Sequence, residues 1–506
     1  MKIFATKDIK DIDAATVEQE GISSYDLMER ASHALTKEIE GRWTDKDTRF
    51  VVFAGAGNNG GDALAVARML LDNGRRVDAY LFNKGGSLSP DCEMNRDLLL
   101  EQYPGKLTEV AREFNPPTLT ADDVVVDGLF GSGLNRPLEG GFASVVRYIN
   151  GRRAQVVSID IPSGLMGEDN TRNNPDNIVR ADVTLTLQLP KLAFLFPENE
   201  RYFGSWMLVD IGLSADAINS KPSCYEMADE EDMPWMLKVR GRFDHKGMFG
   251  RALLIAGQLG MAGASVLASK ACMRSGVGLL TVHVPKCNNV VVQSAVPEAM
   301  TDIDVNETHF AHVPQDITGY NAIGIGPGIG QDVDTRSALY DLINAAKVPM
   351  VLDADALNLI GQKHSYLQRL PQGSIITPHP GEMDRLVGRC SNSYERLMRA
   401  RELAQKCDVY VVLKGAYTVV ISPDGACWFN STGNPGMATG GSGDVLTGVI
   451  LALLAQGYDA STAAKLAVYA HGLAGDMAAR INGETGMTAG DIVNLLPKVW
   501  KTLETV

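Results

Sequence analysis

Cysteine is scarce in this chain, and the cysteines are not spaced as in a disulfide or metal-binding motif. There are seven in 506 residues, at Cys92, Cys224, Cys272, Cys287, Cys390, Cys407 and Cys427. Their number is odd and no two form a C-x-x-C pair, so neither a disulfide framework nor a zinc knuckle is predicted. This usage is typical of a reducing compartment, and we expect a cytoplasmic protein.

Long apolar runs and an excess of basic residues are also absent. No window approaches about 18 uninterrupted apolar residues, and the N-terminus has no apolar signal region, so we expect neither a membrane span nor export. Lysine and arginine total 47 against 61 aspartates and glutamates, which gives a formal net charge of -14. This balance argues against nucleic acid or an anionic membrane surface as the main partner. Any phosphorylated ligand must therefore be held by backbone amides and a few basic side chains.

In the first half of the chain, short β-branched runs alternate with segments of helical length. The runs are apolar on both faces, which is typical of parallel strands in a βαβ sheet. They cover residues 48–55, 75–82, 122–128, 154–162 and 181–189. A leading helix is expected over residues 23–40. The pattern predicts a Rossmann-like α/β domain over residues 1–216.

The alternation fades over residues 214–247, which are acidic, proline-containing and aperiodic, so we place a domain boundary near residues 216–226. The pattern then restarts, with strands expected at 250–257, 278–285, 320–328, 349–357, 374–382 and 409–415. Two strands joined by an Asp424-Gly425 turn and a buried helix over residues 443–457 should follow. The length exceeds a single core and no internal repeat joins the halves, so a second, different α/β domain is expected over residues 226–506.

A glycine-rich turn follows the first predicted strand. In "VVFAGAGNNGGDALAVARML", Gly55, Gly57 and Gly60 satisfy G-x-G-x-x-G between a strand and a helix, which is the context that a phosphate-binding turn requires. Glycine admits close backbone approach, and the helix N-terminus supplies unpaired N–H groups. The alternative is a tight turn that needs glycine for packing alone. The next strand ends in "YLFNKGG" without an acid, which disfavours an ordinary NAD-dependent dehydrogenase.

Two further predicted strands end in acids, Asp127 and Asp160. Because the carboxyl ends of parallel strands share one edge of a sheet, both acids should lie near the glycine turn. Asp160 can exchange protons with a substrate, whereas Asn59, Asp127 and Ser163 offer hard oxygens suited to a cation. For each acid, the alternative is a helix N-cap or a solvated loop charge.

These motifs, "AGNNGGD", "DGLFGSG", "DIPSG" and the leader "LMERA", resemble the NAD(P)HX epimerase family over roughly residues 1–216. The resemblance implies potassium at Asn59, Asp127 and Ser163, and a catalytic Asp160. It implies dinucleotide contacts from Asn58, Asn59, Gly60, Gly61, Asp62, Gly131, Ser132, Gly133, Leu134, Asn135, Arg136, Pro137 and Asp160. Epimerisation at C6 of the hydrated nicotinamide is chemically reasonable, because the ring nitrogen stabilises an iminium-like centre and one acid–base residue suffices to move the hydroxyl proton.

A second glycine cluster lies at residues 434–448, "NPGMATGGSGDVLTG". It contains no Walker motif. The successive amides of Gly440–Gly443 ahead of an apolar helix predict an anion site reinforced by the helix dipole, which is the stabilisation that phosphoryl transfer needs. Asp444, in the first turn of that helix, is placed to take the proton from an attacking hydroxyl. The alternative is that Asp444 merely favours the helix N-terminus.

This cluster resembles the ribokinase-like superfamily, and "GRALLIAG", "GIGPGIG", "VLDADALN", "ITPHPGEMDRL" and "LKGAYTVV" narrow the resemblance to ADP- or ATP-dependent NAD(P)HX dehydratases over roughly residues 226–506. It implies dinucleotide contacts from Ala262, Gly328, His379, Pro380, Gly381, Glu382, Met383, Asp384, Arg385 and Asp444. It implies contacts to the adenine nucleotide, bound with Mg²⁺, from Lys414, Gly415, Ala416, Tyr417, Thr418, Asn434, Pro435, Gly436, Met437, Ala438, Thr439, Gly440, Gly441, Ser442 and Gly443. A buried, hydrogen-bonded His379 and a solvated Lys414 are the alternatives for those two residues.

Together, the resemblances imply a bifunctional repair enzyme for hydrated nicotinamide cofactors. One half would interconvert the R and S epimers of NADHX or NADPHX. The other would phosphorylate the C6 hydroxyl at the expense of ADP or ATP, after which phosphate leaves and the double bond re-forms. The alternatives are a ribokinase-like kinase for a vitamin-type alcohol and a dinucleotide sensor that only binds. We also expect a homo-oligomer.

Overall fold

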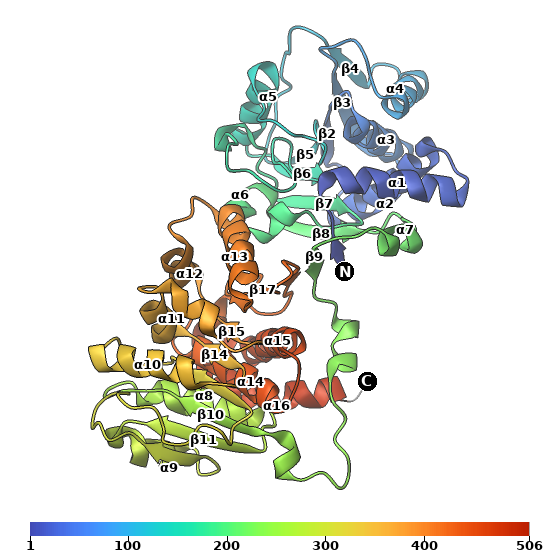
Figure 1. The fold of residues 1–506 in the computed structure, drawn as a ribbon. Coiled ribbons are helices and arrows are strands. Elements are labelled where there is room, and N and C mark those ends of the chain that lie inside the picture. Colours follow the sequence, from blue (N-terminus) through green and yellow to red (C-terminus); the bar gives the residue numbers. More distant parts are fainter. Residues whose placement is uncertain (505–506) are drawn as a thin grey trace. The chain divides into compact units, whose positions relative to one another are not determined.

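The computed structural model describes residues 1–504 and divides into two compact units (Figure 1). The N-terminal unit comprises Lys2–Ser223 together with Asn392–Tyr394. The C-terminal unit comprises Met1, Cys224–Ser391 and the chain from Glu395 onwards. Among residues 1–504, no helix combines the length and apolar character that crossing a membrane requires.

The N-terminal unit is built on a parallel sheet with the strand order β4-β3-β2-β5-β6-β7-β8. The seven strands of this sheet are β2 (Arg49–Ala54), β3 (Arg76–Phe82), β4 (Leu107–Val110), β5 (Asp123–Gly128), β6 (Gln155–Ile159), β7 (Val183–Leu187) and β8 (Ser205–Val209). The two-residue strand β1 (Lys2–Ile3) is not part of it. Its helices are α1 (Thr6–Glu20), α2 (Ser24–Arg42), α3 (Asn58–Asp72), α4 (Pro90–Gln102), α5 (Gly140–Asn150), α6 (Glu200–Phe203) and α7 (Ala215–Ser220). Helices α3 and α5 lie on opposite sides of the sheet (Figure 1).

Both faces of this sheet are covered by apolar cores. Phe50 and Val52 of β2 pack with α2 and α3, while the alternate residues Val51 and Phe53 pack with α5. A strand buried on both faces reads as a continuous apolar run, which is why the sequence predicted these strands correctly. The predicted leading helix is also confirmed as α2, which begins with a capping box between Ser23 and Asp26.

The C-terminal unit contains a larger sheet, ordered β9-β18-β17-β16-β15-β14-β13-β10-β11-β12. Its strands are β9 (Tyr225–Met227), β10 (Arg251–Ile255), β11 (Leu279–Val284), β12 (Met300–Ile303), β13 (Ala322–Ile325), β14 (Met350–Leu352), β15 (Ile375–Ile376), β16 (Tyr410–Leu413), β17 (Val419–Ile421) and β18 (Cys427–Phe429). Its helices are α8 (Ala262–Arg274), α9 (Asn289–Ala295), α10 (Val333–Ala345), α11 (Ala354–Ile360), α12 (Pro380–Val387), α13 (Ser393–Cys407), α14 (Ser442–Ala455), α15 (Ala460–Gly486) and α16 (Ala489–Glu504).

The strands from β16 to β12 are parallel, and β17 pairs antiparallel with both of its neighbours. The predicted Asp424-Gly425 turn between β17 and β18 is confirmed, with Gly425 at a φ of 88°. Helices α8, α14, α15 and α16 share one large apolar core with the sheet. The predicted helix over residues 443–457 is therefore confirmed as α14, which is buried along almost its whole length.

Two predicted strands are much shorter in the structure than in the sequence analysis. The segment 374–382 contributes only Ile375–Ile376, and 349–357 contributes only Met350–Leu352. In both cases a helix begins almost at once, at Pro380 and at Ala354. Proline fits the first position of a helix, which explains the early end of the first strand pattern.

Candidate active sites

In the N-terminal unit, the strand order changes direction between β2 and β5. Parallel sheets bind ligands at the carboxyl edge beside such a switch point. The strand register places Phe53 of β2 opposite Asp127 of β5, and Asp127 opposite Ser158 of β6. The glycine turn after β2 and the two predicted acids therefore lie along one edge, as the sequence predicted.

Close backbone approach explains the glycines around this edge. A Cβ at Gly60 would overlap the carbonyl oxygen of Gly55, so this turn admits no side chain there. A Cβ at Gly131 would lie 3.1 Å from the Asn59 side chain and 3.2 Å from Oδ2 of Asp160. The loop that carries Gly131 thus brings Asn59 and Asp160 to a common point. Further along it, Asn135 and Arg136 are exposed.

Asp160 is held in a strained backbone conformation, with a φ of 66°. Its Oδ1 lies 2.5 Å from Nζ of Lys191, and its Oδ2 accepts a hydrogen bond of 2.9 Å from the backbone N–H of Ser132. Burial alone would raise the pKa of Asp160, but the charge and the hydrogen bond of Lys191, together with hydrogen bonds from Ser132, outweigh burial and lower the pKa. Asp160 is therefore an oriented carboxylate at neutral pH.

Lys191 was missed by the sequence analysis. Its side chain is only 2% exposed, and besides Asp160 its ammonium donates to Thr186 at 2.9 Å and to the carbonyl of Leu189 at 3.1 Å. All three ammonium protons are thereby used. Lys191 lies just after a predicted strand. The reasoning that placed Asp127 and Asp160 at the carboxyl edge of the sheet would therefore have placed Lys191 there as well.

Two further acids, Asp13 and Asp62, interact electrostatically with Asp160. Burial and the neighbouring Asp160 raise the pKa of Asp13, on α1, to about 6. Burial also raises the pKa of Asp62, on α3, well above its usual value, with a further contribution from Asp160. One lysine thus faces a group of three aspartates.

Asp127 is fully buried and is hydrogen-bonded by neutral groups. Its Oδ2 accepts from Ser158 Oγ and from the Ser163 N–H, both at 2.8 Å, and its Oδ1 accepts from Ser163 Oγ at 2.6 Å. Burial raises its pKa despite these bonds. No cationic side chain within residues 1–504 forms an ion pair with it. Nearby, the Nδ2 of Asn59 is buried without a hydrogen-bond partner.

In the C-terminal unit, the strand order changes direction between β10 and β13. The loop after β13 carries Gly328, whose φ is 62°, and a Cβ there would lie 3.1 Å from Met261 and 3.2 Å from Ala264. Gly328 therefore lies against the start of α8, where Ala262 is the first residue. The structure brings these two predicted dinucleotide contacts together at the switch point.

His379 is half exposed and serves as the N-cap of α12. Its Nδ1 accepts from the N–H of Gly381 at 3.0 Å and of Glu382 at 3.3 Å, and Glu382 accepts from the His379 N–H at 2.9 Å. The alternative of a buried His379 is therefore wrong. The Nε2 of His379 lies 3.3 Å from Oε1 of Glu382, and the side chain is 49% exposed.

Lys414 is partly buried and forms an ion pair with a buried acid, so it is not a solvated strand end. Its Nζ lies 2.8 Å from Oδ1 of Asp353 and 4.0 Å from Glu382. Asp353 Oδ2 also accepts from the Thr447 hydroxyl at 2.9 Å. Burial alone would lower the pKa of Lys414, but Asp353 and Glu382 outweigh burial and raise it. The sequence analysis missed Asp353, which ends β14 and precedes the strained Ala354.

Asp444 lies in the first turn of α14, as predicted. The N-cap is Gly441, at a φ of 90°, and Asp444 itself is not the capping residue. A Cβ at Gly443 would lie 3.4 Å from Lys414 Nζ and 3.6 Å from Asp353, so the helix start approaches this ion pair closely. Burial and the charge of Asp353 raise the pKa of Asp444 to about 7. Such a carboxyl is poised for proton transfer near neutral pH.

The loop before α14 is anchored from α15. Asp476 accepts from the N–H of Gly433 and from Nδ2 of Asn434, both at 2.9 Å, and the buried His471 contacts the Ser442 carbonyl at 3.0 Å. Burial lowers the pKa of His471 to about 4, so its ring is neutral. These contacts from α15 fix the position of the predicted phosphate-binding loop.

Comparison with known proteins assigns both units. Residues 24–193 match the family described as YjeF-related protein N-terminus, and residues 252–498 match NAD(P)H-hydrate dehydratase. The bifunctional NAD(P)H-hydrate repair enzyme Nnr of Moorella thermoacetica is 34% identical, over 100% of this chain and 97% of that protein. The chain belongs to the bifunctional NAD(P)H-hydrate repair family. The family member of Escherichia coli is 33% identical, over 95% of this chain and 90% of that protein.

One solved structure supports the fold of this repair-family chain. The ADP/ATP-dependent NAD(P)H-hydrate dehydratase from Bacillus subtilis, co-crystallised with ATP/Mg²⁺, is 36% identical and covers 55% of this chain and 99% of its own, with a TM-score of 0.50. The predicted combination of a Rossmann-like and a ribokinase-like α/β domain is confirmed.

Proposed function

We propose that this chain repairs hydrated nicotinamide cofactors by two reactions, epimerisation of NAD(P)HX in the N-terminal unit and nucleotide-dependent dehydration of the S epimer in the C-terminal unit. One observation supports the proposal above all. The chain aligns over its full length with bifunctional relatives and contains both reactive aspartates, Asp160 and Asp444. A kinase or a sensor has no comparable support, because neither needs the second reactive carboxylate.

For epimerisation, Asp160 is the group that moves the proton of the C6 hydroxyl. Its carboxylate is ionised and held by Lys191 and the Ser132 amide, so it is ready to act as a base and then as an acid. The C6–O bond breaks, the leaving hydroxide takes up a proton to form water, and the ring nitrogen stabilises the iminium centre. Asp160 then removes a proton from the water that adds to the opposite face. Binding falls to the predicted loops 58–62 and 131–137.

The side chains around Asp127 fit a potassium ion. A buried carboxylate with only neutral partners and the hydroxyl of Ser163, which contacts it at 2.6 Å, are oxygen donors of the kind that a hard cation prefers, and Asn59 would add its side-chain oxygen. When bound, potassium would supply positive charge beside the dinucleotide.

For dehydration, Asp444 takes the proton from the C6 hydroxyl while the hydroxyl oxygen attacks the terminal phosphoryl group, and AMP leaves from ADP or ADP leaves from ATP. The amides of residues 440–443 and the positive end of α14 stabilise the transferred phosphoryl group, and Lys414 neutralises the phosphates. Phosphate is a far better leaving group than hydroxide, so it departs as the double bond re-forms.

The acids beside Lys414 also fit a magnesium ion that arrives with the nucleotide. Oδ1 of Asp353 and Oε2 of Glu382 lie 2.8 Å and 4.0 Å from Nζ of Lys414, so two carboxylates are available to a magnesium ion beside the phosphates. Magnesium would supply charge neutralisation to the phosphates. The remaining nucleotide contacts are proposed for residues 415–418 and 434–439.

The test is incubation of the purified chain with mixed-epimer NADHX, with and without ADP or ATP, while the absorbance of NADH is followed. We expect recovery of both epimers only when nucleotide is present. A stable phosphate ester without NADH would instead identify a small-molecule kinase, and binding without turnover would identify a sensor.

A further inference from the structure

Strand β11 of the C-terminal unit carries a buried histidine, His283, which the sequence analysis did not single out. Its side chain is 3% exposed. Its Nδ1 lies 2.7 Å from Oδ2 of Asp302, the cross-strand neighbour on β12, and its Nε2 lies 3.2 Å from Oδ2 of Asp304. Phe310 packs edge-on against the ring, with the two centroids 5.6 Å apart. The imidazole is therefore enclosed between two acids and an aromatic ring.

This geometry sets the protonation state of His283. A carboxylate accepts hydrogen bonds and does not donate them, so each of the two ring nitrogens must carry a proton. The ring is thus an imidazolium, and its charge compensates Asp304, whose side chain is fully buried. Burial alone would raise the pKa of Asp304, but hydrogen bonds from His283 and from backbone amides outweigh burial and lower it.

Asp304 fixes the loop that follows β12. Its Oδ1 accepts from the N–H of Asn306 at 2.9 Å, and its Oδ2 accepts from the N–H groups of Ala311 and His312 at 2.7 Å and 3.0 Å. The ring of His312 also lies 3.1 Å from Oδ1, but that side chain is 62% exposed, so water screens its charge. His283 is the buried cation that stabilises the carboxylate on which this loop depends.

The loop 304–312 supports the segment between β10 and α8. The carbonyl of Thr308 accepts from the N–H of Leu259 at 2.7 Å. Two residues further on, Met261 lies against Gly328, since a Cβ at Gly328 would be 3.1 Å from the Met261 Cβ. Gly328 is a predicted dinucleotide contact. A chain of direct contacts therefore leads from the buried histidine to the predicted dinucleotide site.

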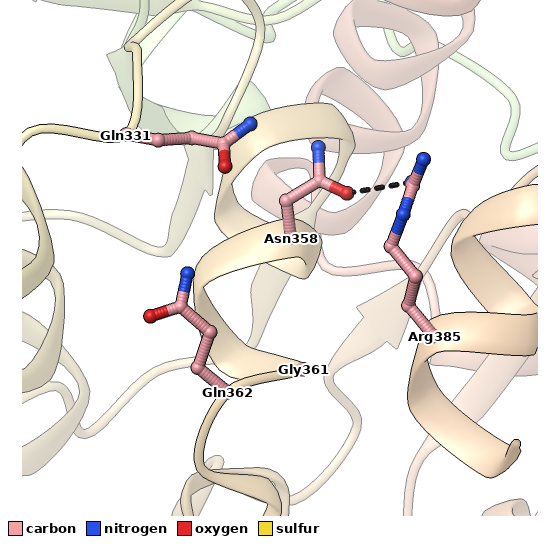
Figure 2. Close-up of a pocket in the computed structure, with 5 residues that line it drawn as sticks. All are labelled: Gln331, Asn358, Gly361, Gln362 and Arg385. Carbon is pink, nitrogen blue, oxygen red and sulfur yellow. Dashed lines mark hydrogen bonds between the residues drawn. The ribbon is translucent and has the colours of Figure 1, made fainter.

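The segment between β10 and α8 also supports the far end of the loop after β13. A Cβ at Gly330 would overlap the side-chain amide of Gln258, so the two loops are in close contact. The next residue, Gln331, lines a cavity of about 370 Å³ (Figure 2). A displacement of the segment 257–261 would therefore be transmitted to Gly328 and to this cavity together.

We propose that His283, as an imidazolium, is a positioning residue for the dinucleotide site of the C-terminal unit. Through Asp304 it holds the loop 304–312, and through that loop it holds the segment 257–261 against Gly328. The inference rests on the proposed dehydration of the S epimer, to which it adds a residue remote from the substrate.

The first test is the dehydration kinetics of His283→Gln, which keeps a polar side chain but removes the charge. The KM for S-NADHX should rise about 2- to 30-fold, the range that altered coupling through a packed network produces. The kcat and the KM for ADP or ATP should change by less than about twofold. The reason is that the network lies at the β12 end of the sheet, whereas the first nucleotide segment follows β16.

A control variant separates this effect from a general loss of stability. Val499→Ala removes buried volume from the core of the same unit, on α16. It should lower the midpoint of urea unfolding and leave both KM values unchanged. Circular dichroism of each variant checks that the fold is retained.

The route through Asp304 is tested by Asp304→Asn and by the double variant with His283→Gln. If His283 acts through Asp304, the double variant should raise the KM for S-NADHX no more than the larger of the two single changes. Additive rises would overturn this route.

Two further results would overturn the proposal, an unchanged KM for S-NADHX in folded His283→Gln and an equal rise of KM for dinucleotide and nucleotide. If His283→Gln does not fold, Asp302→Asn replaces it, and a KM for S-NADHX that stays at the wild-type value then overturns the proposal. A wild type that binds S-NADHX without dehydrating it contradicts the proposed function alone, and dissociation constants from calorimetry then replace KM in the same comparison. A wild type that does not bind S-NADHX contradicts both.

Discussion

At the scale of single residues, Asp160 is buried and Asp444 is partly buried, and their surroundings set opposite protonation preferences. Lys191 lowers the pKa of Asp160 in spite of burial, whereas burial and Asp353 raise that of Asp444 to about 7. A carboxylate that stays ionised suits reversible proton exchange. One that titrates near neutral pH suits a base that must hold a proton after phosphoryl transfer.

The pH dependence of dehydration follows from Asp444. Because its pKa is raised to about 7, the ionised base is lost as the pH falls, and the rate should drop about tenfold per unit below that value. Epimerisation by the same sample is the internal control, because the lowered pKa of Asp160 predicts no such limb near pH 7. A dehydration rate that stays level through this range would contradict the assignment.

The ion pair between Lys191 and Asp160 should also contribute to the free energy of unfolding. In Lys191→Met, Asp160 remains as an uncompensated buried charge, so the free energy of unfolding at neutral pH should fall by about 3–5 kcal/mol. Since the folded-state pKa of Asp160 is lowered, this stabilisation is present at neutral pH and disappears in acid.

Urea unfolding measures this change. Combining Lys191→Met with Asp160→Asn should recover much of the loss, because both charges are then removed. Lys221→Met, which removes a lysine from the exposed pair with Asp11, is the control and should have little effect. If Lys191→Met unfolds like the control, the pair does not have the role described.

Individual residues were predicted well where they end an element. Asp127, Asp160 and Asp444 were found because a strand or a helix terminus places them at a sheet edge. Lys191 and Asp353 obey the same rule but have no glycine motif beside them, and their ion pairs join segments far apart in the chain. Such pairings depend on tertiary packing, which periodicity alone does not reveal.

At the scale of elements, the strand-to-helix turns at the sheet edges depend on tight backbone packing. In the turn between β2 and α3, Gly60 faces the Gly55 carbonyl, whereas a Cβ at Gly57 would meet nothing within 4 Å. The sequence motif treats these glycines alike. Their different surroundings become visible only when the turn and the helix are packed together.

This difference gives a matched pair of variants. Gly60→Ala forces a methyl group against backbone, so the free energy of unfolding should fall by about 1–3 kcal/mol or more. Gly57→Ala occupies open space at an ordinary φ of -95° and should change stability by less than about 1 kcal/mol. Equal losses in denaturant unfolding would show that the close approach at Gly60 is not what restricts the turn.

Element types were predicted better than their lengths. Every predicted strand of the two sheets exists, but β15 has only two residues, since His379 and Pro380 begin a helix that the apolar pattern could not distinguish from strand. The strands β1, β4, β8, β9 and β12 were not predicted. With two to five residues each, they are too short to show a clear period.

At the scale of the whole molecule, the chain joins two units with separate cores and separate candidate sites. The proposed boundary at residues 216–226 falls within α7 at one end and within β9 at the other, because the aperiodic sequence hides two short elements. A division after Ser223 keeps both elements intact.

We therefore expect residues 1–223 and 224–506 to fold when expressed apart. Each fragment should unfold cooperatively and keep one activity, epimerisation in the first and dehydration in the second. Circular dichroism and the two assays would check this. Failure of both fragments to fold, while the intact chain does, would show that the units depend on each other.

The central claim is that two acids in two sites share the repair of one substrate, and the most direct measurement is the extent of NADH recovery from mixed-epimer NADHX with saturating nucleotide. In the time that the wild type needs to convert all of the NADHX, Asp160→Asn should convert only the S epimer and leave the R epimer. Asp444→Asn should dehydrate about 100- to 10,000-fold more slowly. Mixing the two variants should restore complete recovery. Complete recovery at the wild-type rate by either variant alone would contradict the account.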